Sequence, residues 1–159
     1  MIKYAIIVLL AGTLLYGCKN PLESMPDFEL LLPDSTTILN TRNIPKDKIS
    51  ILIHFESDCL ECQAQTSDIL KNMDSLKSIQ FYFLTTERFQ RLSVFNKHYK
   101  IVNYPNIIAG QDFEKFFPKF IQIPSTPLLA VYDKNKKLRM VFNGRINAQE
   151  LISALKKIQ

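Results

Sequence analysis

The sequence predicts an α/β fold in which a central mixed β-sheet is flanked by helices. Apolar segments of strand character alternate with amphipathic helical segments between residues 49 and 99, an order typical of parallel strands joined by helical crossovers. The last third adds a strand–turn–strand pattern and a closing helix, which supplies an antiparallel part of the sheet. With 159 residues and 47% apolar content, the chain has room for one ordinary hydrophobic core.

The first segment of the chain has the pattern of a secretory signal peptide. One early cation, Lys3, precedes an apolar run over residues 4–11. This run is too short to cross a bilayer comfortably, because about 20 apolar residues are needed and charge returns at Lys19. We therefore expect a signal peptide over residues 1–17 that is removed by cleavage.

Cys18 stands where a bacterial lipoprotein would carry its lipid. The preceding residues, Leu-Tyr-Gly at 15–17, resemble a lipobox, in which a small residue precedes the cysteine that becomes diacylated. Several acyl chains give stable anchoring at about 0.8 kcal/mol per buried methylene. We expect a lipidated Cys18 and a tether over residues 18–25, with a folded domain over 26–159. An uncleaved anchor or a plain signal peptide is the alternative.

The first half of the folded domain should contain two strands and two helices. A β-branched, apolar run over residues 49–55 predicts a buried strand, and a second core strand is predicted over 79–84. Between them, apolar residues recur at three- and four-residue spacing over 60–77, which indicates an amphipathic helix. The same spacing predicts a helix over 87–99.

The second half should contain a short apolar piece, a brief helix, a hairpin and a closing helix. Two apolar strands on either side of a polar turn at 133–136 indicate the hairpin, and the closing helix follows Asn143-Gly144. In chain order, the predicted elements cover residues 107–109, 113–120, 128–132, 138–142 and 148–158.

The chain has 3 cysteines, and assigning Cys18 to lipid leaves the pair Cys59 and Cys62. An exported protein meets oxidising surroundings, which permit disulfide chemistry. Cys59 lies at the start of the predicted helix, where unpaired backbone N–H groups and the helix dipole stabilise a thiolate. Cys62, one turn later, can close a disulfide with Cys59 or attack a mixed disulfide formed at it.

These features resemble the thioredoxin superfamily, specifically the membrane-tethered thioredoxin-like and redoxin-type proteins of bacterial envelopes. The match rests on a strand, Cys59-Leu60-Glu61-Cys62 and a helix, and on Thr126-Pro127 followed by the hairpin and the terminal helix. It implies a thioredoxin-like fold with an N-terminal strand extension near residues 26–30. It also implies that Pro127 is cis and lies against the dithiol, where the backbone of Thr126 pairs with an extended substrate.

The resemblance assigns roles to individual residues. Cys59 and Cys62 would be catalytic, with Cys59 attacking a substrate disulfide and Cys62 resolving the mixed disulfide, while Thr126 and Pro127 would bind the substrate. The lipidation site would be Cys18, and Lys19 after it favours delivery to the periplasmic side of the outer membrane. Protein thiols and disulfides of the envelope are the expected partners, and the protein is expected to be a monomer.

The surroundings of the dithiol depart from typical relatives. Tryptophan usually precedes the first cysteine, whereas here Asp58 does, and the chain contains no tryptophan. The carboxylates of Glu56, Asp58 and Glu61 surround the pair, and they disfavour a thiolate at Cys59 and oppose the helix dipole. Weaker stabilisation of the reduced form indicates a more reducing couple, so a reductase or disulfide-shuffling role is favoured over a strong oxidase.

Other functions are weighed against this hypothesis. One alternative is a non-catalytic thioredoxin-fold binding module in which the cysteines form a structural disulfide. A second is metal delivery through two thiolates, which lacks supporting methionine or histidine ligands nearby. No cofactor or resident metal is expected, since a structural zinc site wants four ligands and the only histidines are His54, interpreted as a satisfied core residue, and His98. The net charge of +5 is scattered, so nucleic acid is not an expected partner.

Overall fold

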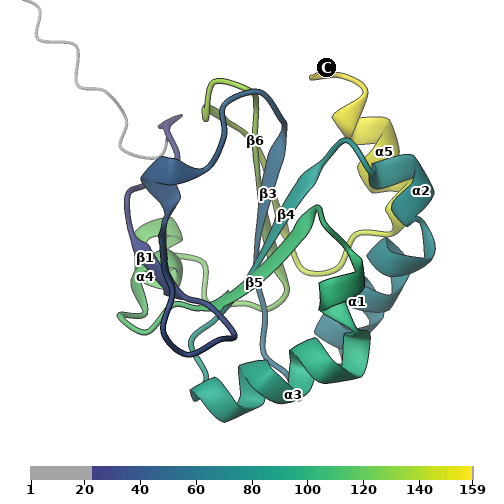
Figure 1. Cartoon of the computed structure of the whole chain (residues 1–159). Coiled ribbons are helices and arrows are strands. Elements are labelled where there is room, and N and C mark those ends of the chain that lie inside the picture. The colour runs from purple at the N-terminus through teal and green to yellow at the C-terminus, as the bar shows by residue number, and fades with distance from the viewer. Residues whose placement is uncertain (1–22, 159) are drawn as a thin grey trace, which may run out of the picture.

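The computed structural model describes residues 23–158, which form a seven-stranded sheet with helices on both faces (Figure 1). The strand order is β2-β1-β5-β4-β3-β6-β7, in which β5, β4 and β3 are parallel and the other pairings are antiparallel. This confirms the predicted α/β class and its mixed sheet. The strands are β1 (Glu29–Leu31), β2 (Ile38–Asn40), β3 (Ser50–His54), β4 (Gln80–Thr85), β5 (Ile107–Gln111), β6 (Leu128–Tyr132) and β7 (Leu138–Asn143).

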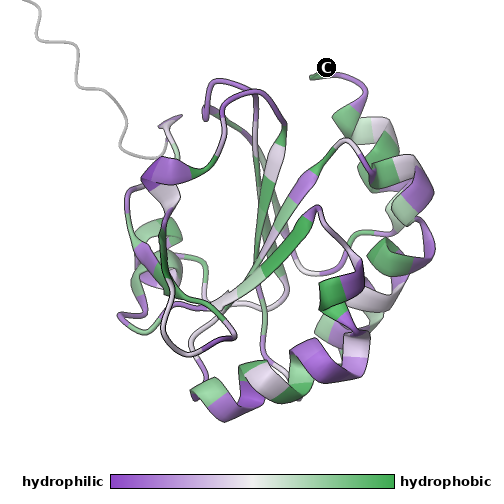
Figure 2. Ribbon diagram, in the orientation of Figure 1, coloured by the Kyte–Doolittle hydropathy of each residue, from purple (hydrophilic) through white to green (hydrophobic). Residues whose placement is uncertain are grey.

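The helices differ in length and separate into two groups around the sheet. The described α-helices are α1 (Leu60–Lys71), α2 (Met73–Leu76), α3 (Phe89–Tyr99), α4 (Phe116–Ile121) and α5 (Ala148–Leu155), with short 3-10 helices η2 (Thr41–Asn43) and η3 (Ile101–Asn103). Helix α4 lies beside β1 at the left of Figure 1, whereas α1, α2 and α5 lie at the right. Figure 2 shows apolar residues concentrated in the strands and on the inner sides of the helices.

Strand β3 lies at the centre of the core and leads directly to the candidate site. All five of its residues are buried, and it pairs in parallel with β4 and antiparallel with β6. Its alternating side chains enter separate apolar clusters, with Ile51 and Ile53 among α1, α3 and α5 residues and Leu52 on the α4 face. The apolar residues that predicted a buried strand therefore contribute to both faces of the sheet.

The helix predicted over residues 60–77 is interrupted at Asn72. The N–H of Asn72 bonds to the carbonyls of Ile69 and Leu70, and its side-chain amide donates to the carbonyl of Asp68 at 2.9 Å. Asn72 leaves helical geometry at φ −108° and ψ 18°, and the short α2 follows. The prediction of one continuous helix is therefore wrong, because a local side-chain hydrogen bond competes with the helical pattern at Asn72.

The N-terminal part contains a hairpin, of which only the first strand was expected. The turn between β1 and β2 is held by Asp34, whose carboxylate accepts from the backbone N–H groups of Thr36 and Thr37. Each strand has three residues, too few to give a clear alternating pattern. Packing also begins before position 26, since the N–H of Met25 bonds to the carbonyl of Lys136 and Met25 is buried.

The later elements follow the predicted order. The short apolar piece at 107–109 belongs to β5, which reaches Gln111 and pairs with β4 and β1. The brief helix predicted near 113–120 is α4, whose first N–H groups, at Phe116 and Phe117, are accepted by the buried carboxylate of Asp112.

The predictions for the signal peptide over 1–17 and for lipidation at Cys18 lie outside the described residues. Within residues 23–158, no helix combines the length and apolar character needed to span a membrane.

Candidate active site

Cys59 caps the N-terminus of α1, directly after the loop that follows β3. Its backbone is extended, its carbonyl accepts from Gln63 N–H at 3.0 Å, and its Sγ accepts from Cys62 N–H at 3.1 Å. The sulfur thus takes the place of the side-chain oxygen that usually caps a helix. A backbone N–H and the positive end of the helix dipole therefore both face the sulfur.

Cys62 lies one turn later in different surroundings. It is 2% exposed and belongs to the apolar cluster formed by α1, α3 and α5, whereas Cys59 is half-buried. Burial raises the pKa of the Cys62 thiol to about 12, and its hydrogen bond with Cys59 acts in the same direction. Near neutral pH, Cys62 therefore remains a thiol.

Thr126 and Pro127 lie beside this pair, at the start of β6. The thiol of Cys59 donates to the carbonyl of Thr126 at 3.6 Å, and the Thr126–Pro127 peptide bond is cis, as the resemblance implied. The structure thus brings together all four predicted site residues in its described part. Cys59 follows the C-terminal end of β3, and Thr126 precedes the N-terminal end of β6. These two strand ends are neighbours because β6 pairs antiparallel with β3.

A carboxylate that the sequence reasoning missed holds the loop before Cys59. Glu87, between β4 and α3, accepts from Ser57 N–H at 2.6 Å and from the Ser57 hydroxyl at 3.0 Å. The Thr85 hydroxyl donates to the same carboxylate, and the Gln63 side chain donates to the Ser57 carbonyl at 2.8 Å. These bonds, which we call the Glu87 clamp, fix the loop that presents Cys59.

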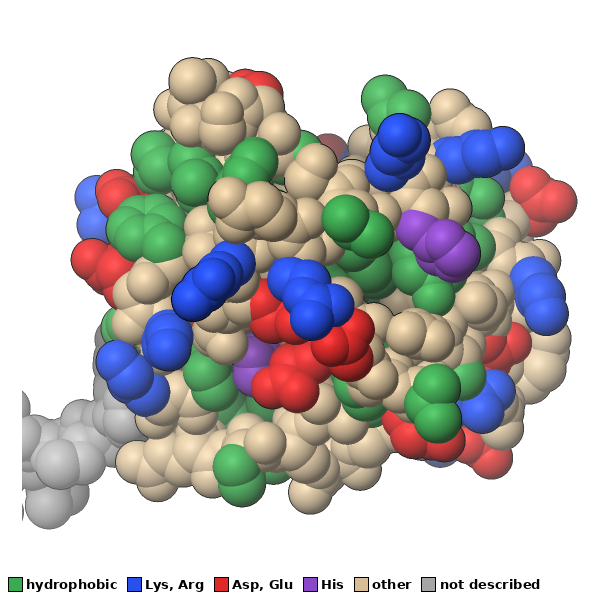
Figure 3. All heavy atoms as spheres, turned by 90° about the horizontal axis from the view of Figure 1, so that it is seen from below, with side chains coloured by type: hydrophobic (Ala, Val, Ile, Leu, Met, Phe, Trp, Pro, Cys, Tyr) green, Lys and Arg blue, Asp and Glu red, His purple; other side chains and the backbone are tan. Residues whose placement is uncertain are grey.

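Charged residues surround the solvent-facing part of the site around Cys59, which we call the mouth. Glu56, Asp58 and Glu61 are exposed, and the face seen in Figure 3 carries a compact group of acidic side chains bordered by basic ones. Asp58 forms an ion pair with Arg91 of α3 at 2.7 Å. One of the three carboxylates expected to oppose a thiolate is therefore paired with a cation, a partner that the sequence reasoning did not identify.

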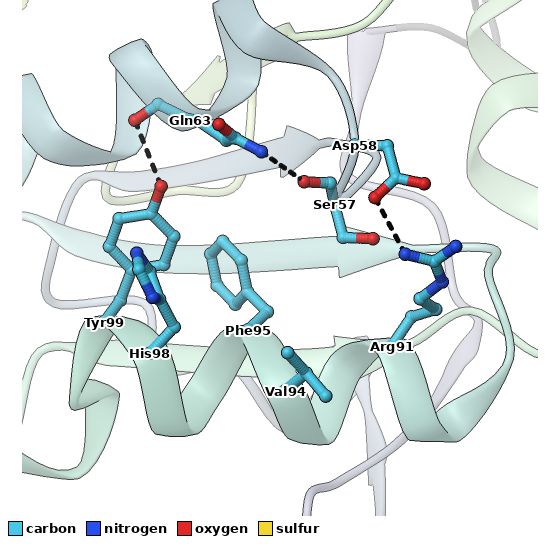
Figure 4. A pocket seen from close by; sticks show the side chains of 8 residues that line it. All are labelled: Ser57, Asp58, Gln63, Arg91, Val94, Phe95, His98 and Tyr99. Carbon is cyan, nitrogen blue, oxygen red and sulfur yellow. Dashed lines mark hydrogen bonds and ion pairs between the residues drawn. The ribbon is translucent and has the colours of Figure 1, made fainter.

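A pocket of about 300 Å³ opens next to the dithiol, between α3 and the first turn of α1 (Figure 4). The side chains of Phe95 and Tyr99 project from α3 toward α1, and Val94 lies at the edge. The Asp58–Arg91 pair crosses one end. The pocket therefore begins at the residue immediately before Cys59.

His54 is the last residue of β3, and its environment differs from the predicted one. It is buried as predicted, but neither ring nitrogen has a hydrogen-bond partner among residues 23–158. Burial lowers the pKa of His54, and the nearby charge of Asp112 opposes this shift. Asp112 itself is fully buried and accepts from the start of α4. The interpretation of His54 as a satisfied core residue is therefore wrong.

The described residues, 23–158, contain no cluster of three or more histidine, cysteine, aspartate or glutamate side chains arranged to hold a metal ion. At this site the described residues offer two thiols and the groups around them.

Solved structures of low sequence identity share this arrangement of strands and helices. A secreted Mycobacterium tuberculosis disulfide oxidoreductase, homologous to E. coli DsbE, gives a TM-score of 0.68 at 13% identity and covers 82% of this chain and 95% of its own. A peroxiredoxin-like protein from Aquifex aeolicus gives 0.66 at 14% identity, covering 86% of each chain. Copper-bound ScoI from Arabidopsis thaliana gives 0.67 at 12% identity, covering 86% of this chain and 96% of its own.

These likenesses define the fold of the chain as thioredoxin-like, which confirms the fold that the resemblance implied. In direct sequence comparison, the chain matches no protein-family model and no curated protein.

Proposed function

We propose that the protein is a thiol–disulfide oxidoreductase of the bacterial envelope that acts on protein substrates through Cys59 and Cys62. The observation that carries the proposal is the asymmetry of the pair, with Cys59 accessible at the helix start and Cys62 buried one turn later. An accessible sulfur that accepts a backbone N–H can attack a disulfide, and a buried neighbour can resolve the product. The Thr126 carbonyl beside Cys59 supports this proposal, because it offers an acceptor to an extended substrate backbone.

In the reducing direction, the Cys59 thiolate attacks one sulfur of the substrate disulfide and releases the other as a thiolate. Cys62 then attacks Cys59, forms the Cys59–Cys62 disulfide and releases the second substrate sulfur. Two electrons pass from the dithiol to the substrate. The Cys62 proton and the proton that Cys59 gave to solvent when it ionised end on the two released thiols. A dithiol protein of the envelope must then reduce the Cys59–Cys62 disulfide for the next turnover.

The charges at the mouth favour a reductase or disulfide-shuffling role over a strong oxidase. Glu56 and Glu61 remain exposed near the dithiol and disfavour a thiolate there. The Asp58–Arg91 pair reduces this effect but does not reverse it, because the pair is neutral overall. A less stabilised thiolate corresponds to a more negative reduction potential.

The location of the protein is proposed from its N-terminal sequence. The signal pattern over 1–17 and the lipobox-like residues before Cys18 support lipid anchoring, and Lys19 supports delivery to the outer membrane. We expect the full chain to incorporate a labelled fatty acid and to sediment with membranes. The Cys18→Ser chain should lose the label. Retention of the label in Cys18→Ser would contradict lipidation at this residue.

The midpoint potential of the Cys59–Cys62 couple tests the function, measured in the full chain with glutathione and dithiothreitol buffers. A reversible couple between about −200 and −270 mV, the range of glutaredoxins and thioredoxin, supports a working reductase or isomerase. A potential near about −120 mV would contradict the reducing role and indicate an oxidant. A disulfide that stays closed well below about −300 mV would instead favour the alternative, a binding module with a structural disulfide.

A further inference from the structure

The pocket beside Cys59 is placed to contact the substrate. The sheet order β4-β3-β6 puts Thr126, before β6, on one side of Cys59 and the α3 pocket, after β4, on the other. Because an extended chain rises about 3.3 Å per residue, a side chain one to three residues from the substrate cysteine reaches a site that begins at Asp58. The pocket therefore lies within reach of side chains close to the substrate cysteine.

The lining of the pocket indicates the chemistry of its occupant. Phe95 forms its floor, Tyr99 contributes a half-buried ring, and Val94, with 66% of its surface exposed, forms its edge. Several polar groups are already paired, since Gln63 donates to the Ser57 carbonyl and its backbone carbonyl accepts from the Tyr99 hydroxyl. The exposed ring of His98 also lines the pocket. An occupant therefore gains mainly by covering apolar surface.

The size and closure of the pocket fit a single side chain. A volume of about 300 Å³ is at the lower limit for small-molecule sites, which span about 300–1,000 Å³. The Asp58–Arg91 pair at one end is 71% and 53% exposed at its two side chains, so it separates at little cost when a chain passes.

We infer that this pocket is a specificity subsite that binds an apolar side chain, aromatic ones best, carried within three residues of the cysteine in a protein disulfide substrate. The inference rests on the proposed oxidoreductase function and adds the class of sequence that the site prefers. Selectivity arises from covering Val94 and the half-buried ring of Tyr99 while the substrate sulfur is at Cys59.

The test uses short peptides whose single cysteine carries glutathione as a mixed disulfide and is flanked on both sides by phenylalanine, alanine or glutamate. Reduced full chain carrying Cys18→Ser is mixed with each peptide in excess over it, and the rate of glutathione release is followed in a single turnover. The phenylalanine peptide should react about 10-fold faster than the alanine peptide, as expected for burying one apolar side chain in a pocket. The glutamate peptide should react no faster than the alanine peptide.

Two matched valine substitutions locate the effect. Val94→Gln changes the exposed edge of the pocket, at a helical position where glutamine is well tolerated, and should reduce the phenylalanine-to-alanine ratio to about 3 or less. Val102→Gln changes a 93% exposed valine that does not line this pocket, and should leave the ratio at its wild-type value.

The outcomes distinguish failure of the subsite from failure of the oxidoreductase function. Equal rates with the phenylalanine and alanine peptides would overturn the subsite and leave the oxidoreductase proposal standing. An unchanged ratio in Val94→Gln would also overturn it, because the selectivity would then arise elsewhere. Failure of every peptide to react would remove the oxidoreductase function and the subsite together.

Discussion

The mouth around Cys59 and the core around Cys62 are separated by one helical turn and differ in almost every physical property. At the mouth, the sulfur is half-buried, accepts a backbone N–H and lies near exposed charges. In the core, the sulfur is surrounded by apolar side chains, and burial raises its pKa to about 12. The fold thus gives two identical side chains different reactivities, one suited to attack from solution and one shielded until its partner is modified.

The largest expected effect is a difference in alkylation rate between the two thiols. In a Cys18→Ser background, Cys62→Ser leaves only Cys59 and Cys59→Ser leaves only Cys62. At pH 7.5, Cys59 should react with iodoacetamide at least about 100-fold faster than Cys62, because a buried thiol is almost fully protonated and inaccessible. Since the thiolate is the reactive form, the Cys62 rate should rise as pH increases. Similar rates at pH 7.5 would remove the asymmetry on which the proposal depends.

The position of the two cysteines could be predicted from the sequence because the elements that hold them are local. The strand at 49–55, the two cysteines and the following helix are contiguous, so periodicity and spacing place Cys59 at a helix start. Thr126-Pro127 is remote, and only the resemblance to a known family placed it beside Cys59.

The groups that support the mouth could not be predicted in the same way. Glu87 and Arg91 are 30 and 33 residues from their partners Ser57 and Asp58, and they meet them only because β3 and β4 are parallel neighbours. A polar residue at the end of a predicted strand is a weak signal for such a contact. The break at Asn72 was missed for another reason, since a side-chain hydrogen bond leaves no mark in apolar periodicity.

The hydrogen bonds of the Glu87 clamp hold the loop before Cys59, and they can be weakened without changing the apolar core. Glu87→Gln replaces one of the two accepting carboxylate oxygens with an NH2 group that cannot accept, so only one of the two Ser57 donors keeps its acceptor. Unfolding of the reduced protein should therefore become easier by about 1–3 kcal/mol. Denaturant unfolding measures this change. Glu114→Gln, at an exposed position on the loop before α4, is the control and should change stability by less than about 0.5 kcal/mol. Equal stability of the two variants would show that the clamp contributes nothing.

The buried His54, the last residue of β3, should make the stability of the protein depend on pH. Its folded-state pKa is lowered by burial, so the unfolded chain binds the proton more tightly. The contribution to stability is therefore complete above the unfolded pKa of about 6.5 and is lost as pH falls below it. His54→Leu should weaken the fall in melting temperature between pH 7.5 and 5.5 and, by removing two unpartnered nitrogens, stabilise the protein at pH 7.5 by about 1 kcal/mol.

The exposed histidine provides the control for this effect. His98→Gln should leave the pH dependence of the melting temperature as it is in the unsubstituted chain, because His98 lies on the exposed face of α3. An undiminished pH dependence in His54→Leu would mean that other groups cause it.

The smallest expected effect concerns the exposed Asp58–Arg91 pair. Arg91→Gln should change stability by less than about 1 kcal/mol, since both side chains are more than half exposed. It should also leave the Asp58 carboxylate uncompensated and move the midpoint potential toward more negative values by at most ~20 mV. The shift should vanish in about 1 M salt, where exposed charges are screened. A shift toward positive potentials would contradict the assigned effect of the charges at the mouth.

The most direct test of the division of labour between Cys59 and Cys62 is to locate the mixed disulfide. Full-length Cys62→Ser and Cys59→Ser chains are each incubated with oxidised glutathione at pH 7.5, and the adducts are identified by mass spectrometry of peptides. We predict a stable glutathione adduct on Cys59 in Cys62→Ser and almost none on Cys62 in Cys59→Ser. Comparable adducts on both cysteines, or an adduct confined to Cys62, would contradict the account.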